Sequence, residues 1–469
     1  MAAGDPLLFE VAQRALLLSL PEPEAITYRQ GILADCLSHP AVVRDLYQLA
    51  GEALAAQKSI WGSILQQEQP RSLLRTSVQK MAILITFLRR LRDTAVEHGP
   101  SFHSPGLSRF FAMVMEELDD EYFALIEGYV TELNFKSGLL LSARLAGGNK
   151  SAGYTLRRAR EQGFIARMLD RSGYTFTVAD RDEAGARALG ELEDRGVNLV
   201  ANALAQSVHH VSSFFVMLRK EIGFYVACLN LAERLSDKQE PTAFPTVVSH
   251  DRAQLTARAL YDVCLTLTID GPVVANDIDA DHKSLIMITG GNQGGKSTLL
   301  RSIGLAQLMA QCGMFVAADS LAVSACDGVF THYKREEDET MESGKLDEEL
   351  ARMSAIAEHI TPRCLLLCNE SFAATNEREG SQIARQVVDA MLGENVRVTF
   401  VTHMFDLANG YYEQGKSDAL FLRAERGAEG SRPFRLSEGE PLPTSYGEDS
   451  YRKIFGKAVS PTTVAATDT

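Results

Sequence analysis

The run from Ser284 to Arg301 has the residue types and spacing of a phosphate-binding loop. An apolar stretch ends at glycines, and the pattern Gly-x4-Gly-Lys-Ser follows. Glycines let consecutive backbone N–H groups surround an anion without Cβ clashes, and a helix beginning at Lys296 would direct its positive end at the same phosphates. The lysine of this pattern reaches the β- and γ-phosphates, and the serine hydroxyl binds Mg²⁺. We therefore predict that ATP and Mg²⁺ bind at Gly290, Asn292, Gly294, Gly295, Lys296, Ser297 and Thr298.

A second apolar stretch, Cys364–Cys368, ends in Asn369 and Glu370 about seventy residues downstream. A phosphate loop needs such a strand to carry the carboxylate that organises Mg²⁺ and the attacking water, so Glu370 is the predicted base. Asn369 stands where an aspartate is expected. Its amide oxygen can still accept a hydrogen bond from Ser297 or from a Mg²⁺-bound water, but the charge-assisted part, about 1–2 kcal/mol, is lost. The sequence predicts weaker Mg²⁺ binding through Ser297 and Asn369, and slow hydrolysis.

A third apolar stretch, Val396–Thr402, ends in His403. A lone histidine at the end of a strand is most often simply solvated. Here it ends a predicted strand of the same parallel sheet, in which ligands bind outside the carboxyl ends of the strands. We therefore predict that His403 senses the γ-phosphate.

The elements that would position these residues follow two different patterns in two parts of the sequence. Up to about residue 250, apolar residues recur at three- and four-residue spacing with few prolines, which predicts helices, the last two of them long enough to act as levers. Those helices are predicted at Ile26–Gln57, Leu73–His98, Ser108–Leu145 and Asp182–Leu235. Farther along, strands alternate with helices, which is typical of a parallel sheet covered by helices. Those strands are predicted at Leu265–Ile269, Ser284–Thr289, Cys364–Cys368 and Val396–Val401.

The predicted fold class is thus multidomain, α and α/β. A helical core or lever domain over residues 1–250 precedes a P-loop ATPase domain over residues 251–459, with a mostly parallel sheet. Residues 460–469 are predicted to be a flexible tail.

The composition favours a globular protein over a membrane protein or a chain covered in nucleic acid. The 469 residues are 45% hydrophobic and 23% charged, as in globular proteins. A net charge of −14 argues against a chain covered in nucleic acid, although it permits a local basic patch. We predict a cytoplasmic protein, because a signal peptide and a membrane-length apolar stretch are both missing. The seven cysteines form no C-x-x-C pair, and Cys364 and Cys368 are predicted to share a buried face of one strand.

Between the two longest predicted helices lies a basic interruption at residues 146–181, which contains few acids and several glycines. Such a tip could contact a polyanion. Its arginines could equally pair with neighbouring carboxylates in a solvated helix connection, and the residues alone leave both interpretations open. The candidate contacts to a polyanion are Lys150, Arg157, Arg158 and Arg160.

The stretch Thr289–Thr298 resembles the T-G-P-N-M-G-G-K-S-T loop of the MutS family of DNA mismatch-repair ATPases, with Gly291 and Gln293 as departures. The segment Gly271–Asn276 resembles the one that lies against the adenine, with Val273 in place of the usual aromatic. Further resemblances are found at Gly313–Ala318, Asp327–Thr331, Ser343–Lys345, Thr402–Leu407 and Ser445–Gly447.

This resemblance implies that the P-loop domain is an ATPase of the ABC class, and that the chain forms a homodimer that shares composite ATP sites. It also implies that the polyanion is DNA. The family's block D-E-I-G-R-G-T-S-T-x-D-G appears as Asn369–Gly380, and the Ser-Thr pair that faces the partner's nucleotide has become Asn376-Glu377. The family's mismatch-reading domain and C-terminal dimerisation extension are not expected, because the chain begins near the helical core and ends soon after Ser445–Gly447. The resemblance thus predicts an ATP-switched clamp for DNA repair or recombination that recognises branched or deformed duplex by shape.

Two alternatives remain open at this stage. The acidic composition favours a nucleotide-switched scaffold that does not touch DNA, and Asn369 favours a nucleotide sensor with little turnover.

Overall fold

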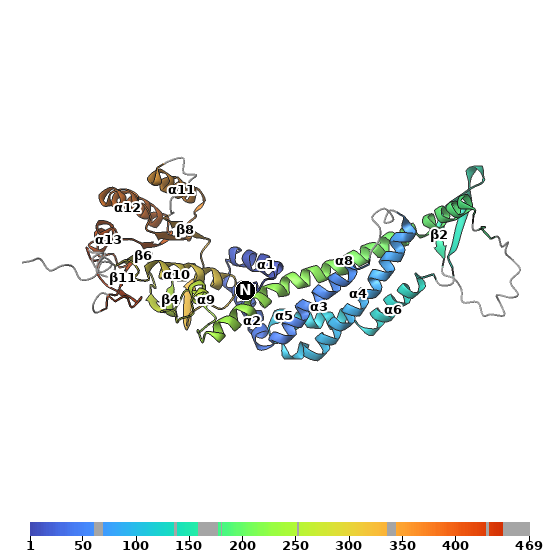
Figure 1. Cartoon of the computed structure of the whole chain (residues 1–469), viewed down its shortest axis with the longest axis horizontal. Helices are drawn as coiled ribbons and strands as arrows, with labels where there is room; N and C mark the ends of the chain where they lie inside the picture. Colours follow the sequence, from blue (N-terminus) through green and yellow to red (C-terminus); the bar gives the residue numbers. More distant parts are fainter. Residues whose placement is uncertain are drawn as a thin grey trace, which may run out of the picture. The chain divides into compact units, whose positions relative to one another are not determined.

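A computed structural model of the chain describes residues 1–60, 69–135, 138–157, 177–179, 181–250, 253–334, 344–427 and 431–443. Contacts divide the chain into two units, one of Met1–Ala34 with Ala227–Thr469 and the other of Asp35–Val226. The boundaries fall inside α2 (Pro23–Ser38) and α8 (Glu183–Asp237), labelled in Figure 1. This division differs from the predicted boundary at residue 250, because the first helices group with the α/β part of the chain.

The second unit is helical. α4 packs against the helices on either side of it in sequence, as the apolar spacing of its residues requires. Its core contains Leu46, Met81, Leu88, Phe111 and Phe123, all buried. The helices are α3 (Pro40–Lys58), α4 (Pro70–His98), α5 (Pro105–Glu117), α6 (Asp120–Glu132) and most of α8.

Two predicted helices are wrong, because a proline divides one and a capping aspartate divides the other. Ile26–Gln57 is two helices, since Pro40 lacks an N–H and disfavours helical backbone at the residue before it. Ser108–Leu145 contains two helices and a strand. Asp119 accepts a hydrogen bond from Tyr122 N at 2.7 Å and so starts α6 afresh. Of the two predicted long helices, only the one that became α8 is present.

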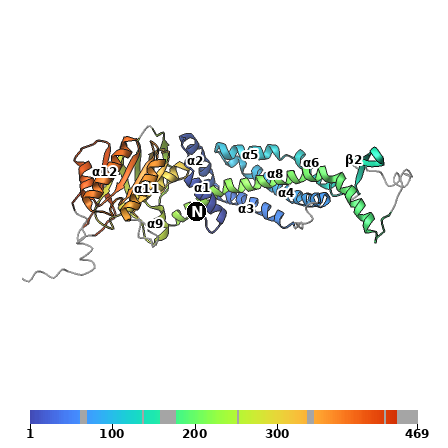
Figure 2. The ribbon, with the colours of Figure 1, turned by 90° about the horizontal axis from the view of Figure 1, so that it is seen from above.

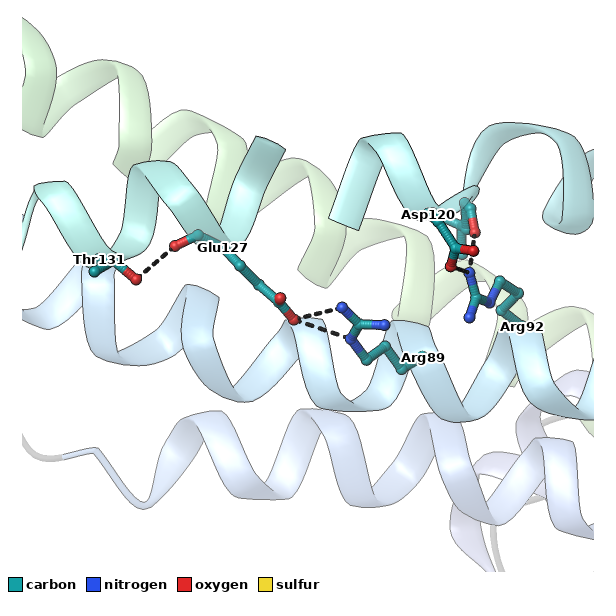
Figure 3. Close-up of polar contacts among 6 residues, drawn as sticks. Arg89, Arg92, Asp120, Glu127 and Thr131 are labelled. Atoms are coloured by element: carbon teal, nitrogen blue, oxygen red, sulfur yellow. Dashed lines mark hydrogen bonds and ion pairs between the residues drawn. The ribbon is translucent and has the colours of Figure 1, made fainter. Parts of the chain in front are cut away.

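Two arginines fasten α6 to α4 (Figure 3). Arg89 and Arg92 lie over the buried ring of Phe123, with Cζ 4.3 and 5.1 Å from its centroid. Arg89 also donates to Glu127 Oε1 at 2.8 and 2.9 Å, and Arg92 donates to Asp120 Oδ1 at 2.6 Å. Exposed ion pairs of this kind contribute little free energy, so the ring contacts and the burial of Phe123 carry most of the attachment.

The predicted basic tip begins with an antiparallel hairpin. β1 (Leu140–Ala146) pairs with β2 (Lys150–Arg157) through a turn in which Gly148 has φ +71°. Arg157 is exposed, and its Nε donates to Ser142 Oγ at 2.9 Å. The Lys150 side chain and all of Arg158 and Arg160 lie outside the described residues, as do most of the predicted strand 174–178 and the tail 460–469.

The first unit contains the predicted sheet, which is mostly parallel. Its six strands lie in the order β12-β11-β6-β10-β9-β8, and only β12 is antiparallel to its neighbour. The strands are β6 (Leu285–Thr289), β8 (Val329–Tyr333), β9 (Leu365–Asn369), β10 (Arg397–Val401), β11 (Ala419–Ala424) and β12 (Leu436–Glu438).

Helices cover both faces of this sheet. Figure 1 shows α10 (Lys296–Gln311) on one side, and α11 (Lys345–His359) and α12 (Glu377–Gly393) on the other. The core under α11, α12 and α13 (Phe405–Tyr412) includes alternate strand residues such as Met287, Leu366 and Phe400. Cys364 and Cys368 are buried free thiols on this same face, as predicted.

The rest of the unit supports α10. A second sheet has the order β3-β7-β4-β5, from β3 (Thr246–Val248), β7 (Ser320–Ser324), β4 (Leu255–Leu260) and β5 (Asn276–Asp279). α1 (Pro6–Leu17) and the start of α2 lie beside the α/β part in Figure 2, and Arg29 Nη1 donates to Cys312 O at 3.0 Å just past the end of α10. No helix in the described part of the chain combines the length and the hydropathy of a membrane span.

The predicted strand Leu265–Ile269 is wrong. Its residues belong mainly to the short helix α9 (Val263–Thr268), because Asp262 Oδ1 accepts from Cys264 N at 2.9 Å and Leu265 N at 3.0 Å. An apolar run this short fits a buried strand or a buried helix equally well, and the cap decides between them.

Candidate nucleotide-binding and catalytic site

The phosphate loop lies between β6 and α10, as predicted. Gly290 has φ +117° and Gly295, the N-cap of α10, has φ +89°, a region that favours glycine. A Cβ on Gly290 would lie 2.9 Å from the backbone N of Ala424 at the end of the neighbouring β11. The loop therefore owes its tight curvature to glycine, which leaves its backbone N–H groups free to surround an anion.

Lys296 is the most buried charged group of the loop, with 5% of its surface exposed. Its Nζ donates to Gly290 O and Gly291 O, both at 3.0 Å, and lies 3.3 Å from His403 Nε2. Burial lowers the pKa of the Lys296 ammonium to about 8, although the nearby Glu370 carboxylate opposes this shift. The cation is thus held inside the loop by carbonyl oxygens.

Ser297 and Asn369 meet across the end of β10. The Ser297 hydroxyl donates to Asn369 Oδ1 at 2.9 Å, which is the hydrogen bond that an amide in place of aspartate was predicted to retain. Magnesium prefers oxygen ligands and usually keeps several waters. A hydroxyl and an amide oxygen at one place fit such an ion, with less charge than a carboxylate would supply.

Glu370, the predicted base, and His403, the predicted γ-phosphate sensor, lie within hydrogen-bonding distance of each other. Glu370 Oε1 lies 3.1 Å from His403 Nε2, and the hydrogen bond from His403 holds the pKa of the Glu370 carboxyl below its usual range while burial opposes. His403 Nε2 can donate to Glu370 or accept from Lys296, but it cannot do both. The pair therefore has two hydrogen-bonded states, one engaging the base and the other the loop lysine.

Strand register brings these groups together. Glu370 N donates to Val401 O at 2.9 Å, and Thr402 N donates to Ile288 O at 3.0 Å, so β9, β10 and β6 end level with one another. Their carboxyl ends form the edge at which parallel sheets bind ligands. Of the remaining predicted residues, Asn292 is exposed in the loop, Gly294 is buried against Ala424 and Thr298 lies in the first turn of α10.

A buried network behind Glu370 was not predicted. Ser371 Oγ lies 2.6 Å from His332 Nδ1, and His332 Nε2 donates to Glu349 O at 3.0 Å. Glu349 Oε2 accepts from Phe372 N at 2.7 Å, and the rings of Phe372 and His332 stack. Burial lowers the pKa of His332, so its imidazole is neutral, and burial raises the pKa of the Glu349 carboxyl. The two residues that follow Glu370 are thereby fixed to β8 and α11.

A second group missed from sequence lies on the other side of the loop. Asn276 Nδ2 donates to Phe434 O at 3.3 Å, and Asn276 Oδ1 accepts from Leu436 N at 2.7 Å. A Cβ on Gly295 would lie 3.2 Å from the same Phe434 carbonyl, and the Phe434 side chain is about half exposed. The backbone of Phe434 thus lies beside the loop close to Asn276, the end of the segment in which Val273 replaces an aromatic.

Comparison with known families covers both units. Residues 21–238 match the family described as "MutS2 N-terminal domain", and residues 286–447 match "MutS domain V". The second match contains the phosphate loop, Asn369, Glu370 and His403.

Individual proteins similar to this chain are also of the MutS type. The chain is 36% identical over 146 residues to "DNA mismatch repair protein MutS" of Porphyromonas gingivalis, covering 30% of this chain and 16% of the relative. It is 29% identical over 291 residues to the MutS of Parasynechococcus marenigrum, covering 59% and 32%. It is 26% identical over 271 residues to "MutS protein homolog 4" of Mus musculus, covering 56% and 26%. The chain thus matches a third or less of the length of each of these relatives.

Proposed function

Since this chain belongs to the MutS family, with a MutS2 N-terminal domain and the ABC-type ATPase that is MutS domain V, we propose that it binds and hydrolyses ATP to switch a dimeric clamp on DNA. The observation that carries the proposal is the convergence of Lys296, Glu370 and His403 at the ends of three neighbouring strands. Each of these side chains makes a hydrogen bond that a bound nucleotide could replace with one of its own.

Binding uses the loop and its lysine. The backbone N–H groups of the loop and the N-terminus of α10 attract phosphate, and Lys296 exchanges the carbonyl oxygens of Gly290 and Gly291 for phosphate oxygens. Ser297 and Asn369 would hold Mg²⁺, in part through water. When bound, the ion neutralises phosphate charge.

Hydrolysis uses Glu370 as the base. Its lowered pKa keeps the carboxylate ionised at neutral pH, so it can orient a water and accept its proton. His403 Nε2 exchanges its hydrogen bond between Glu370 and Lys296, next to which the terminal phosphate would lie. Release of phosphate then restores the contacts described above.

DNA as the second partner is supported by the basic composition of residues 146–181 and by the relatives that are named DNA mismatch repair proteins. Arg157 is exposed on the β1–β2 hairpin and available to a phosphate. Recognition through such groups reads backbone and shape, which favours branched or deformed duplex, and closure of two ATPase domains would transmit the nucleotide state to the clamp.

Steady-state ATPase activity with and without DNA tests the proposal. We expect turnover that rises with four-way junction or mismatched duplex and falls as salt increases, because the DNA contacts are ionic. If the ATPase rate is the same with and without DNA, and no gel shift is seen at low salt, the nucleotide-switched scaffold would be favoured.

Asn369 favours a second candidate function, a nucleotide sensor with slow turnover. The amide accepts from Ser297 without the charge of an aspartate. Asn369→Asp should then raise Mg²⁺ affinity by about 1–2 kcal/mol, roughly 5- to 30-fold, and increase turnover. Unchanged Mg²⁺ dependence would show that the amide does not limit metal binding.

A further inference from the structure

Glu377 stands where the resembling family has a residue that faces the partner subunit's nucleotide, and its contacts here lie within its own chain. The exposed carboxylate, at the first position of α12, accepts from Phe405 N at 2.7 Å and more weakly from Asp406 N at 3.4 Å. These are the first two amides of α13, which otherwise lack an intrahelical partner. Glu377 therefore caps a helix that begins two residues after His403.

The backbone around His403 is held from both sides. Thr402 Oγ1 accepts from Met404 N at 2.9 Å, and the side chain of Met404, the N-cap of α13, makes no capping hydrogen bond. The amides of residues 404, 405 and 406 thus go to Thr402 and Glu377. A negative charge at this helix end is also favoured by the helix dipole. These contacts fix the backbone that follows His403, and the orientation of the His403 imidazole depends on that backbone.

α12 and α13 are joined along the rest of their length. Arg385 Nη2 donates to Asp406 O at 3.1 Å, and Tyr411 OH donates to Asp389 Oδ1 at 2.8 Å. At the start of α12, a Cβ on Gly380 would lie 2.5 Å from Phe372 O and 3.1 Å from Met404 Sδ. The first turn of α12 therefore packs directly against the segments that follow both Glu370 and His403.

Asn376 has a local role of the same kind. Its Oδ1 accepts from Glu379 N at 3.0 Å and caps α12 itself. The Asn376-Glu377 pair thus fixes the starts of two helices of its own subunit.

We propose that Glu377 is a positioning residue that holds His403 in register with Glu370 and Lys296 of the same subunit. The inference rests on the proposed ATP hydrolysis for its kinetic consequence, while the capping geometry is independent of it. Displacing a catalytic group by about 1 Å can lower a rate by up to about 100-fold.

Kinetics and magnetic resonance together test the inference. Glu377→Ala should lower kcat about 10- to 100-fold with little change in KM for ATP, because the phosphate loop is untouched. Glu377→Gln keeps an acceptor oxygen and should recover most of the rate. The matched control is Glu413→Ala, since the exposed Glu413 accepts from Asn409 Nδ2 at the far end of α13. The His403 imidazole resonance should move in Glu377→Ala and stay in place in Glu413→Ala.

Mixed dimers separate action within a subunit from action across the interface. Combining Glu377→Ala with Lys296→Ala should leave activity low, because neither subunit then has both an intact loop and a positioned His403. Restored activity would overturn the inference and assign Glu377 to the partner's site. If the wild type does not hydrolyse ATP, the proposed function fails by itself, and an unmoved His403 resonance in Glu377→Ala would still overturn the positioning role.

Discussion

The carboxyl edge of the six-stranded sheet and the β1–β2 hairpin are the two regions for which the sequence predicts chemistry, and they hold their side chains in opposite ways. At the sheet edge, Lys296 is buried among carbonyl oxygens and Glu370 is fixed by His403. On the hairpin, Arg157 is exposed and donates to Ser142 within the same two strands. One region depends on long-range packing, and the other on charge and local pairing.

The difference predicts how each region responds to mutation. At the edge, removing one group leaves buried partners unsatisfied, so effects should be large and coupled. On the hairpin, one exposed charge interacts through high dielectric, so effects should be small, additive and sensitive to salt.

The largest effect is expected for Lys296→Ala. Two charge-assisted hydrogen bonds to phosphate are lost, each about 1.5–3 kcal/mol, so ATP affinity should fall at least about 100-fold by calorimetry. The control is Lys283→Ala, since the half-buried Lys283 donates to Ser417 O away from the loop and should leave affinity unchanged. Equal losses in the two variants would mean that the lysine effect is not specific to the loop.

A smaller effect, in stability as well as rate, is expected for Glu349→Ala. The buried Phe372 N loses its acceptor, which should lower the free energy of unfolding by about 1–3 kcal/mol. Because Phe372 lies two residues after Glu370, kcat should fall too, while ATP affinity is kept. The neighbouring Glu348→Ala removes a half-buried 3.9 Å ion pair with Arg352 and leaves the acceptor of Phe372 N in place, so it should change stability less than Glu349→Ala. Chemical denaturation that finds both variants alike would contradict the network's role.

ATP affinity should also depend on pH through Lys296. Bound phosphate favours the ammonium form, so the affinity contributed by this group is present below its pKa of about 8 and is lost as pH rises above it. Between pH 7 and pH 9 the Kd should increase about tenfold. A flat profile over this range would mean that the lysine keeps its proton in the nucleotide-free loop.

The sequence allowed prediction of the site wherever one short segment determines the geometry. The glycine spacing of the loop, the strand ends at Asn369 and Thr402, and the sheet that aligns them follow from local patterns. The contacts of Glu349 and Glu377 do not, because each joins residues more than twenty positions apart. The one signal for Glu377 was its departure from the family's block, which marks a position without stating its contact.

Prediction of the fold from sequence is limited in the same way. Short apolar runs and continuous helical periodicity do not reveal where a cap intervenes, so Asp262 turned a predicted strand into α9 and Asp119 divided a predicted helix. Caps are local in sequence, but their competition with periodicity is decided by packing.

The smallest effect is expected on the hairpin. Arg157→Glu should weaken DNA binding modestly and reduce the slope of log affinity against log salt by about one, since about one phosphate contact is lost. Affinity should change equally for different DNA sequences, because backbone contacts carry no base information. Titrations at several salt concentrations check this, and an unchanged slope would place the DNA contact elsewhere.

The most direct test of the account compares phosphate release by wild type and Glu370→Gln at saturating ATP, with nucleotide affinity measured alongside. The account predicts similar ATP affinity for both proteins and turnover at least about 100-fold slower in Glu370→Gln, because the amide cannot accept a proton from water. Equal turnover in the two proteins would contradict the assignment of Glu370 as the base.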